Sequence, residues 1–171
     1  MGADGGRPRG TPRIALAGDV ELVRALFREY ADGTGVDLSF QGFEEELATL
    51  PAGYDVLLVA WLGDEAAGCV GVRPFADGAC EMKRLYVRPS ARGTGTGRAL
   101  AAASVEHAQA LGYARMRLDT LPSMEAAQRL YRSLGFVEIE PYRHNPVAGT
   151  AFMELDLSRS GTAPGSRGGS S

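Results

Sequence analysis

The 171-residue sequence has little of what builds disulfide frameworks, metal sites or membrane spans. Its two cysteines, Cys69 and Cys80, are too few for a disulfide framework or a zinc site, and we expect buried free thiols. No apolar run approaches the roughly 20 residues that a membrane helix needs. The first residues contain no hydrophobic stretch of the kind found in signal peptides. The sequence therefore predicts a cytoplasmic protein with no metal and no membrane partner.

The net charge of the chain is also small. The formal net charge is −3, from 18 basic and 21 acidic residues, and this balance argues against a nucleic-acid partner, which would require a basic face. Lysine is almost absent: Lys83 is the only lysine among the 18 basic residues. We interpret this bias toward arginine as the codon pressure of a GC-rich genome.

The chain divides into one candidate domain and two tails. Residues 1–12 and 158–171 are rich in glycine, serine, proline and arginine, and we expect both segments to be disordered. Residues 13–157 form the domain. We expect strands at residues 14–17, 56–62, 66–73, 79–87, 115–120, 136–139 and 151–157, and helices at residues 20–30, 40–47, 97–111 and 123–134, the first capped by Asp19 and the last by Ser123. This alternation predicts an α/β (α+β) fold, a mixed sheet with helices on both faces.

The stretch Arg92-Gly-Thr-Gly-Thr-Gly-Arg98 joins a predicted strand to a predicted helix. Glycines allow a turn with accessible N–H groups, and the N-terminus of a helix adds unpaired donors and a partial positive charge. With an arginine at each end, the stretch is typical of a pyrophosphate site. A P-loop is excluded because no lysine follows Gly97, and the dinucleotide motif G-x-G-x-x-G fails because the sixth position from Gly93 is Arg98. A tight turn without a ligand is the alternative.

These residues resemble a known family. Arg92–Gly97 matches the signature R/Q-x-x-G-x-G/A of the GNAT superfamily of N-acetyltransferases, and residues 130–136 (LYRSLGF) match a later part of its pattern. The order of elements over residues 13–157 is also that of the family. The resemblance implies a GNAT-like, mostly antiparallel sheet of about seven strands flanked by about four helices. It further implies transfer of an acetyl group from acetyl-CoA, the co-substrate, to a primary amine.

The same resemblance assigns acetyl-CoA binding to two segments. The backbone of the strand before the turn pairs with the pantetheine arm and holds the oxyanion, and the residues at these positions are Leu85, Tyr86 and Val87. The turn holds the pyrophosphate, and its residues are Arg92, Gly93, Thr94, Gly95, Thr96, Gly97 and Arg98. The family often has an asparagine in contact with the CoA arm where this chain has Met124, so that contact is lost or replaced, with Ser123 as the candidate.

The resemblance also assigns two catalytic residues. Glu81, eleven positions before Arg92, stands where the family has its glutamate base. A base is needed because an alkyl amine with a pKa of about 10.4 is mostly protonated near neutral pH. Lys83 should share the face of Glu81, lower the pKa of its carboxyl group and weaken it as a base. A bulge in the strand would separate the two side chains, and a relay through water is the other way for Glu81 to act. Tyr131 stands where the family has the acid that protonates the CoA thiolate. The alternatives are a surface ion pair for Glu81 and a core aromatic for Tyr131.

The acceptor amine, a small molecule or a peptide, is expected to enter beside residues 33–43 and 141–150, where Tyr142 and His144 are candidate substrate contacts. Direct transfer in a ternary complex is favoured over an acyl-enzyme because no cysteine or serine has an evident base partner. Two alternatives stay open: a non-catalytic acyl-CoA sensor, and transfer of a different acyl group. The sequence determines neither the acceptor nor the oligomeric state, and a homodimer is compatible with it.

Overall fold

The structure is a computed structural model that describes residues 10–158, so the predictions for residues 1–9 and 159–171 lie outside the described residues. In the described part, seven strands follow one another as β1 (Arg13–Leu16), β2 (Val56–Leu62), β3 (Glu65–Pro74), β4 (Ala79–Val87), β5 (Arg115–Thr120), β6 (Val137–Ile139) and β7 (Ala151–Asp156). The α-helices are α1 (Val20–Thr34), α2 (Phe43–Thr49), α3 (Thr96–Ala110) and α4 (Glu125–Ser133), with short 3₁₀ turns at Ser39–Gln41 and Pro89–Ala91.

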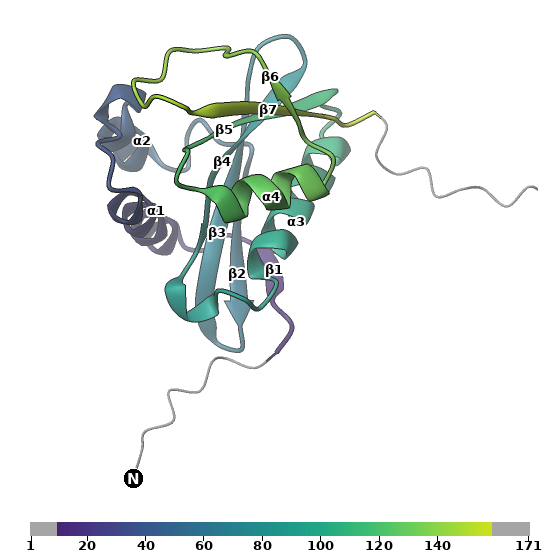
Figure 1. The fold of residues 1–171 in the computed structure, drawn as a ribbon. Coiled ribbons are helices and arrows are strands. Elements are labelled where there is room, and N and C mark those ends of the chain that lie inside the picture. The colour runs from purple at the N-terminus through teal and green to yellow at the C-terminus, as the bar shows by residue number, and fades with distance from the viewer. Residues whose placement is uncertain (1–9, 159–171) are drawn as a thin grey trace, which may run out of the picture.

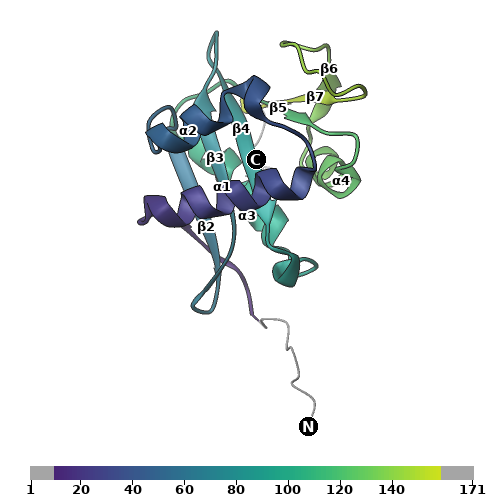
Figure 2. The ribbon, with the colours of Figure 1, turned by 90° about the vertical axis from the view of Figure 1, so that its left-hand side faces the viewer.

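The strands form one mixed sheet in the order β1-β2-β3-β4-β5-β7-β6. Among the described strands, β4 and β5 pair in parallel, and the other neighbours are antiparallel. Helices α1 and α2 cover one face of the sheet, and α3 and α4 cover the other (Figures 1 and 2). Each face has its own apolar cluster, one around Phe27 and Leu47 and the other around Leu100 and Met116. The predicted fold class and the order of the elements are confirmed.

The helix boundaries follow from local interactions. The carboxylate of Asp19 accepts hydrogen bonds from the backbone N–H groups of Glu21 and Leu22, at 2.9 and 3.3 Å, so this predicted cap is confirmed. The second helix begins at Phe43 instead of residue 40. Gly42 has a φ of 68°, and this left-handed residue separates a 3₁₀ turn from α2.

Strand β4 carries two irregularities that open the sheet. Arg84 has a φ of 60°, and at this point the register with β3 shifts, which marks a β-bulge. On its other side, β4 pairs with β5 over Ala79–Glu81 and Arg115–Arg117. From Met82 to Val87, that edge of β4 has no strand partner within the described residues. The backbone groups on this edge are therefore accessible to a ligand.

The two cysteines are free and buried, as predicted. Burial raises the pKa of the Cys80 thiol to about 12 and also raises the pKa of Cys69. Both thiols are therefore protonated near neutral pH, and neither has the character of a nucleophile. Within residues 10–158, no helix has the length and apolar character needed to cross a membrane.

Candidate active site

The glycine-rich turn leads from β4 into α3. Gly93 and Gly95 have φ values of 79° and 83°, a conformation that L side chains rarely adopt, and Gly95 is the N-cap of α3. Apart from the glycine itself and its two chain neighbours, no atom of the described residues lies within 4 Å of the place where a Cβ of either glycine would stand. The first N–H groups of α3, which no helical carbonyl can satisfy, thus lie beside open space. Such a helix start is suited to an anion.

The turn forms one end of an open cleft of about 650 Å³, which also touches β4, α1 and α4. Eight of the ten predicted cofactor residues line this cleft: Leu85, Tyr86, Val87, Arg92, Gly93, Gly95, Thr96 and Gly97. The other two, Thr94 and Arg98, are not among the lining residues. The Thr94 hydroxyl donates to the carbonyl of Ala91, and Nη2 of Arg98 donates to the Ser133 hydroxyl at 2.6 Å.

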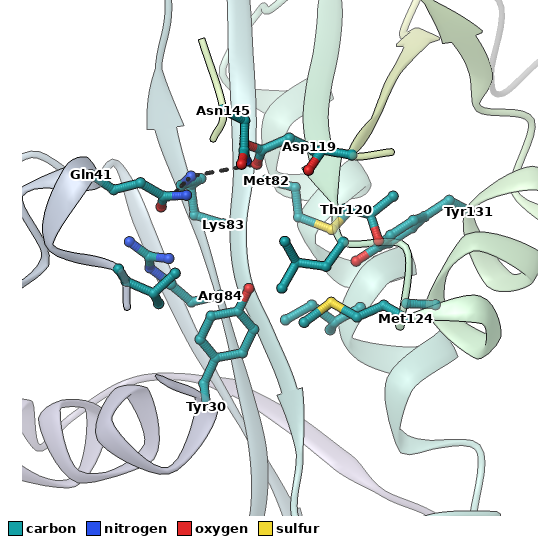
Figure 3. A pocket seen from close by; sticks show the side chains of 15 residues that line it. Tyr30, Gln41, Met82, Lys83, Arg84, Asp119, Thr120, Met124, Tyr131 and Asn145 are labelled. Atoms are coloured by element: carbon teal, nitrogen blue, oxygen red, sulfur yellow. Dashed lines mark hydrogen bonds and ion pairs between the residues drawn. The ribbon is translucent and has the colours of Figure 1, made fainter. Parts of the chain in front are cut away.

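The cleft continues into a smaller pocket of about 40 Å³, which we call the polar pocket. Four residues line both spaces: Tyr30, Leu85, Met124 and Ala127. The polar side chains of the pocket belong to Tyr30, Gln41, Lys83, Arg84, Asp119, Thr120, Tyr131, Asn145 and Thr150. Figure 3 shows Lys83, Asp119, Asn145 and Gln41 on one side of the pocket and Tyr131 on the other. The cleft and the polar pocket thus form one continuous site.

Glu81 is fully buried on β4 beside the polar pocket, and it is not among the residues that line the pocket. Its Oε1 accepts a hydrogen bond from Arg73, and its Oε2 accepts bonds from the Tyr142 hydroxyl at 2.7 Å and from Arg143 at 2.5 Å. Burial alone would raise the pKa of Glu81, but the charges of Lys83 and of the two arginines outweigh it and hold the pKa below its usual value. The bulge follows Lys83 in the sequence and does not separate it from Glu81.

Tyr131 lies on α4, with its ring packed against Phe136 at a centroid distance of 5.7 Å. Its hydroxyl points into the polar pocket (Figure 3). Burial raises the pKa of Tyr131, so the hydroxyl is protonated near neutral pH and can donate a hydrogen bond or a proton. The side chain therefore belongs to the core on one side and to the pocket on the other.

Lys83 and Asp119 also lie in the polar pocket, although the sequence analysis assigned neither to the site. Nζ of Lys83 is 3.6 Å from Oδ1 of Asp119 and 3.3 Å from Oε1 of Gln41. Oδ2 of Asp119 and the Thr120 hydroxyl are buried and have no hydrogen-bond partner among the described residues. Because buried polar atoms are normally paired, these two atoms are exceptions within the pocket. The signal in the sequence that could have indicated this role is the position of Asp119 near the end of strand β5.

Both segments predicted to border the acceptor reach the polar pocket, the first through Gln41 and the second through Asn145. The two predicted contact residues lie differently. Tyr142 points to Glu81, and His144 is exposed; neither is among the residues that line the pocket. Asn145, the residue after His144, lines the pocket.

The start of α4 corrects one prediction. Met124, and not Ser123, is the N-cap residue, and it makes no side-chain cap bond. The turn through Pro122, in which the N–H of Met124 donates to the carbonyl of Leu121 at 2.9 Å, delays the helix by one residue. Ser123 and Met124 both line the cleft, so the predicted contact of Ser123 with the CoA arm stays a prediction.

A cleft with an anion-binding helix start at one end and a buried polar pocket at the other suits an enzyme that carries a group on a long phosphorylated ligand. Within residues 10–158, no three His, Cys, Asp or Glu side chains gather closely enough to hold a metal ion. The fold and the site therefore define a group-transferring enzyme whose described residues offer no metal centre.

Comparison with known proteins identifies the family. The profile of the acetyltransferase (GNAT) family matches residues 21–136, a range that includes β4, the turn and Tyr131. The chain is 42% identical over 154 residues to an uncharacterized N-acetyltransferase of Schizosaccharomyces pombe. The aligned region covers 85% of this chain and 93% of that protein. The protein belongs to the GNAT family of N-acetyltransferases and is an acyltransferase, as the sequence predicted.

Solved structures agree on the fold. The ribosomal-protein-S18-alanine N-acetyltransferase of Escherichia coli matches with a TM-score of 0.67 and 20% identity, over 90% of this chain and 98% of that chain. The yncA protein of Salmonella typhimurium, whose structure contains its cofactor acetyl-CoA, matches with a TM-score of 0.64 and 22% identity, over 92% and 99%. At these identities, the likeness shows a common fold.

Proposed function

We propose that the enzyme transfers an acetyl group from acetyl-CoA to a primary amine, directly and within a ternary complex. The observation that carries this proposal is the continuous site, in which the glycine-rich turn, the free edge of β4 and the polar pocket follow one another. The order fits acetyl-CoA, whose pyrophosphate, pantetheine arm and thioester also follow one another.

Each part of the site has a chemical task. The unpaired N–H groups at the start of α3, together with Arg92, bind the pyrophosphate. The backbone groups on the free edge of β4 pair with the amides of the pantetheine arm, much as an added strand would. This places the thioester near Leu85, where a backbone N–H can stabilise the oxyanion of the tetrahedral intermediate. Apart from the contribution of Arg92, these tasks belong to backbone groups.

The reaction itself takes place in the polar pocket. The amine nitrogen attacks the thioester carbon, a C–N bond forms, and the C–S bond breaks. Tyr131 donates a proton to the departing thiolate, since its hydroxyl is protonated and lies in the pocket. That Glu81 is the base stays a prediction, and its contacts weigh against it, because two arginines and Tyr142 already occupy both carboxylate oxygens.

Two experiments test this function. Isothermal titration calorimetry should show binding of CoA and of acetyl-CoA with one site per chain. A thiol-release assay with acetyl-CoA and a panel of primary amines, including ethanolamine, benzylamine, glycine amide and a lysine-containing peptide, should show release of CoA that depends on the amine. Binding without release for any amine would favour the acyl-CoA sensor. A higher rate with propionyl-CoA would favour another acyl group.

A further inference from the structure

Lys83 is the only lysine of the chain, and the structure places it in the polar pocket. The other 17 basic residues are arginines, so lysine is rare here for reasons of composition. A codon bias explains the many arginines, but it does not explain why the one lysine is buried at the site. Its side chain is only 3% exposed. Burying an ammonium group is costly, so this position calls for a functional explanation.

The contacts of Lys83 hold it loosely. Its ammonium group has three donors, and the two acceptors that it approaches are both long: Oε1 of Gln41 at 3.3 Å and Oδ1 of Asp119 at 3.6 Å. Figure 3 draws both contacts, and Lys83 is one of the residues that line the polar pocket. By contrast, the neighbouring Arg84 is bound by both carboxylate oxygens of Glu46, at 3.1 and 3.2 Å. Arg84 is thus a structural cation, and Lys83 is not fixed in this way.

We propose that Lys83, held by Asp119, is the base that removes the proton from the acceptor amine. This inference rests on the proposed function, and it assigns the proton to a residue other than Glu81. The two carboxylates beside Lys83 differ in a way that supports it. Glu81 has both oxygens paired, whereas Oδ2 of Asp119 is buried without a partner among the described residues. Asp119 therefore has a free oxygen that can receive the charged lysine.

Lysine can serve as a base where arginine cannot, since a guanidinium does not lose its proton in a protein. Burial lowers the pKa of Lys83 to about 8, and the carboxylates of Asp119 and Glu81 limit this decrease. The cations that face Lys83 are Arg84 on the same strand and Arg73 on β3, and both favour the neutral amine. Tyr30 of α1 and Tyr131 of α4, the other titratable groups of the pocket, are protonated near neutral pH. A substantial fraction of Lys83 is therefore neutral near pH 8.

The proton balance of the step is complete. The amine nitrogen forms a bond to the thioester carbon, and its excess proton moves to the lone pair of neutral Lys83. The resulting ammonium is stabilised by the carboxylate of Asp119. The C–S bond breaks, and the sulfur leaves as a thiolate that takes a proton from Tyr131 or from water. Before the next turnover, Lys83 returns its proton to solvent, and Tyr131, where it was the proton donor, regains a proton from solvent. Asp119 is a positioning residue in this scheme, because it acts through Lys83.

The first test uses the single lysine. When the full chain is labelled with carbon-13 at lysine Cε, its NMR spectrum contains one lysine signal, which reports Lys83 alone. We expect this signal to titrate with a midpoint of about 8, and the Asp119→Asn variant to titrate at a lower pH. A midpoint near the ordinary value of 10.5 would overturn the proposal. This titration needs no acceptor amine, so it is independent of the proposed function.

The second test is kinetic and uses the amine of the panel that reacts fastest. Lys83→Arg keeps the charge but cannot titrate, and we expect kcat to fall by about 100-fold or more with KM for acetyl-CoA changed less than about twofold. The rise of kcat with pH around the Lys83 midpoint should disappear, and Asp119→Asn should move that rise to lower pH. Circular dichroism checks that both variants are folded.

Two further results would contradict the proposal, one from kinetics and one from mass spectrometry. One is a Lys83→Arg enzyme with the kcat and the pH profile of the wild type. The other is a mass increase of one acetyl group on Lys83 after incubation with acetyl-CoA alone, which would make the lysine an acyl acceptor instead of a base. A failure of the proposed function would give different results. Calorimetry would show no binding of CoA, or no amine would cause release of CoA from acetyl-CoA, while the NMR titration midpoint of Lys83 would be unchanged.

Discussion

The two ends of the site are built in different ways. At the glycine-rich turn, the chemistry belongs to the backbone: φ values of 79° and 83° and the unpaired N–H groups of α3. In the polar pocket, the chemistry belongs to side chains that come from β4, β5, α4, the segment after α1 and the β6–β7 loop. The glycine-rich turn is therefore encoded by one short segment of sequence. The polar pocket forms only when segments that are distant in the sequence pack together.

The largest effect should come from breaking the backbone end. Gly95→Asp forces a side chain onto a φ of 83° and brings a carboxylate to the anion site, so we expect the affinity for CoA to fall by about 100-fold or more. Gly112→Asp is the matched control, since Gly112 has a φ of 87° and lies beyond the other end of α3. Calorimetry measures the affinity for CoA, and thermal unfolding measures the loss of stability that the strained backbone causes.

The control separates strain from ligand chemistry. Both variants should lose stability to a similar extent, and only Gly95→Asp should lose affinity. Equal affinities of the two variants for CoA would show that the turn does not hold the pyrophosphate.

At the pocket end, Tyr131→Phe should lower kcat by about 10- to 100-fold, because it removes the proton donor and leaves the ring in the core. KM for acetyl-CoA should hardly change. Tyr113→Phe is the control: its hydroxyl bonds to Asp55, and Tyr113 is not among the residues that line the cleft or the polar pocket. Steady-state thiol release measures both variants. A Tyr131→Phe enzyme with full kcat would leave the tyrosine with a packing role only.

Glu81 lies beside the pocket, and we expect its substitution to change mainly the free energy of unfolding of the protein. Its folded pKa is lowered, so its ionic contacts stabilise the protein above the ordinary value of 4.5, and this contribution is lost as the pH falls through the folded pKa. Glu81→Gln should cost about 2 kcal/mol of unfolding free energy at neutral pH and progressively less below about pH 4. Denaturant unfolding across this range tests it. A difference that does not vary with pH would contradict an ionised Glu81.

The smallest effect distinguishes the two arginines of the turn. Arg92 lines the cleft, whereas Arg98 donates to Ser133. Arg92→Gln should weaken CoA binding by about fivefold, the worth of one charge-assisted contact at a partly solvated site, and Arg98→Gln by less than about twofold. Binding at two salt concentrations should show a weaker salt dependence for Arg92→Gln alone. Equal losses for both would mean that Arg98 turns toward the ligand.

Sequence reasoning predicted the fold well because its signals are local. Hydrophobic periodicity placed every strand and helix in the right order, and the glycines between Arg92 and Arg98 marked the turn. It failed where one residue decides a boundary: Gly42 delays α2, and the turn at Pro122 makes Met124 the cap of α4.

The polar pocket was predicted only in part, and the reason is physical. Lys83 meets Asp119 because β4 and β5 are parallel neighbours, and such long-range pairing leaves no local pattern in the chain. Asn145 instead of His144 reaches the pocket because the conformation of the β6–β7 loop decides which side chain points inward. The paired state of Glu81 was equally hidden, since Tyr142 and Arg143 come from that same loop.

A crystal structure with bound acetyl-CoA would show directly which part of the ligand each part of the site holds. We expect the pyrophosphate on the N–H groups that follow Gly95, the pantetheine arm along the free edge of β4, and the acetyl group in the polar pocket between Tyr131 and Lys83. Density for the pyrophosphate away from the turn, or an acetyl group pointing out of the pocket, would contradict this expectation.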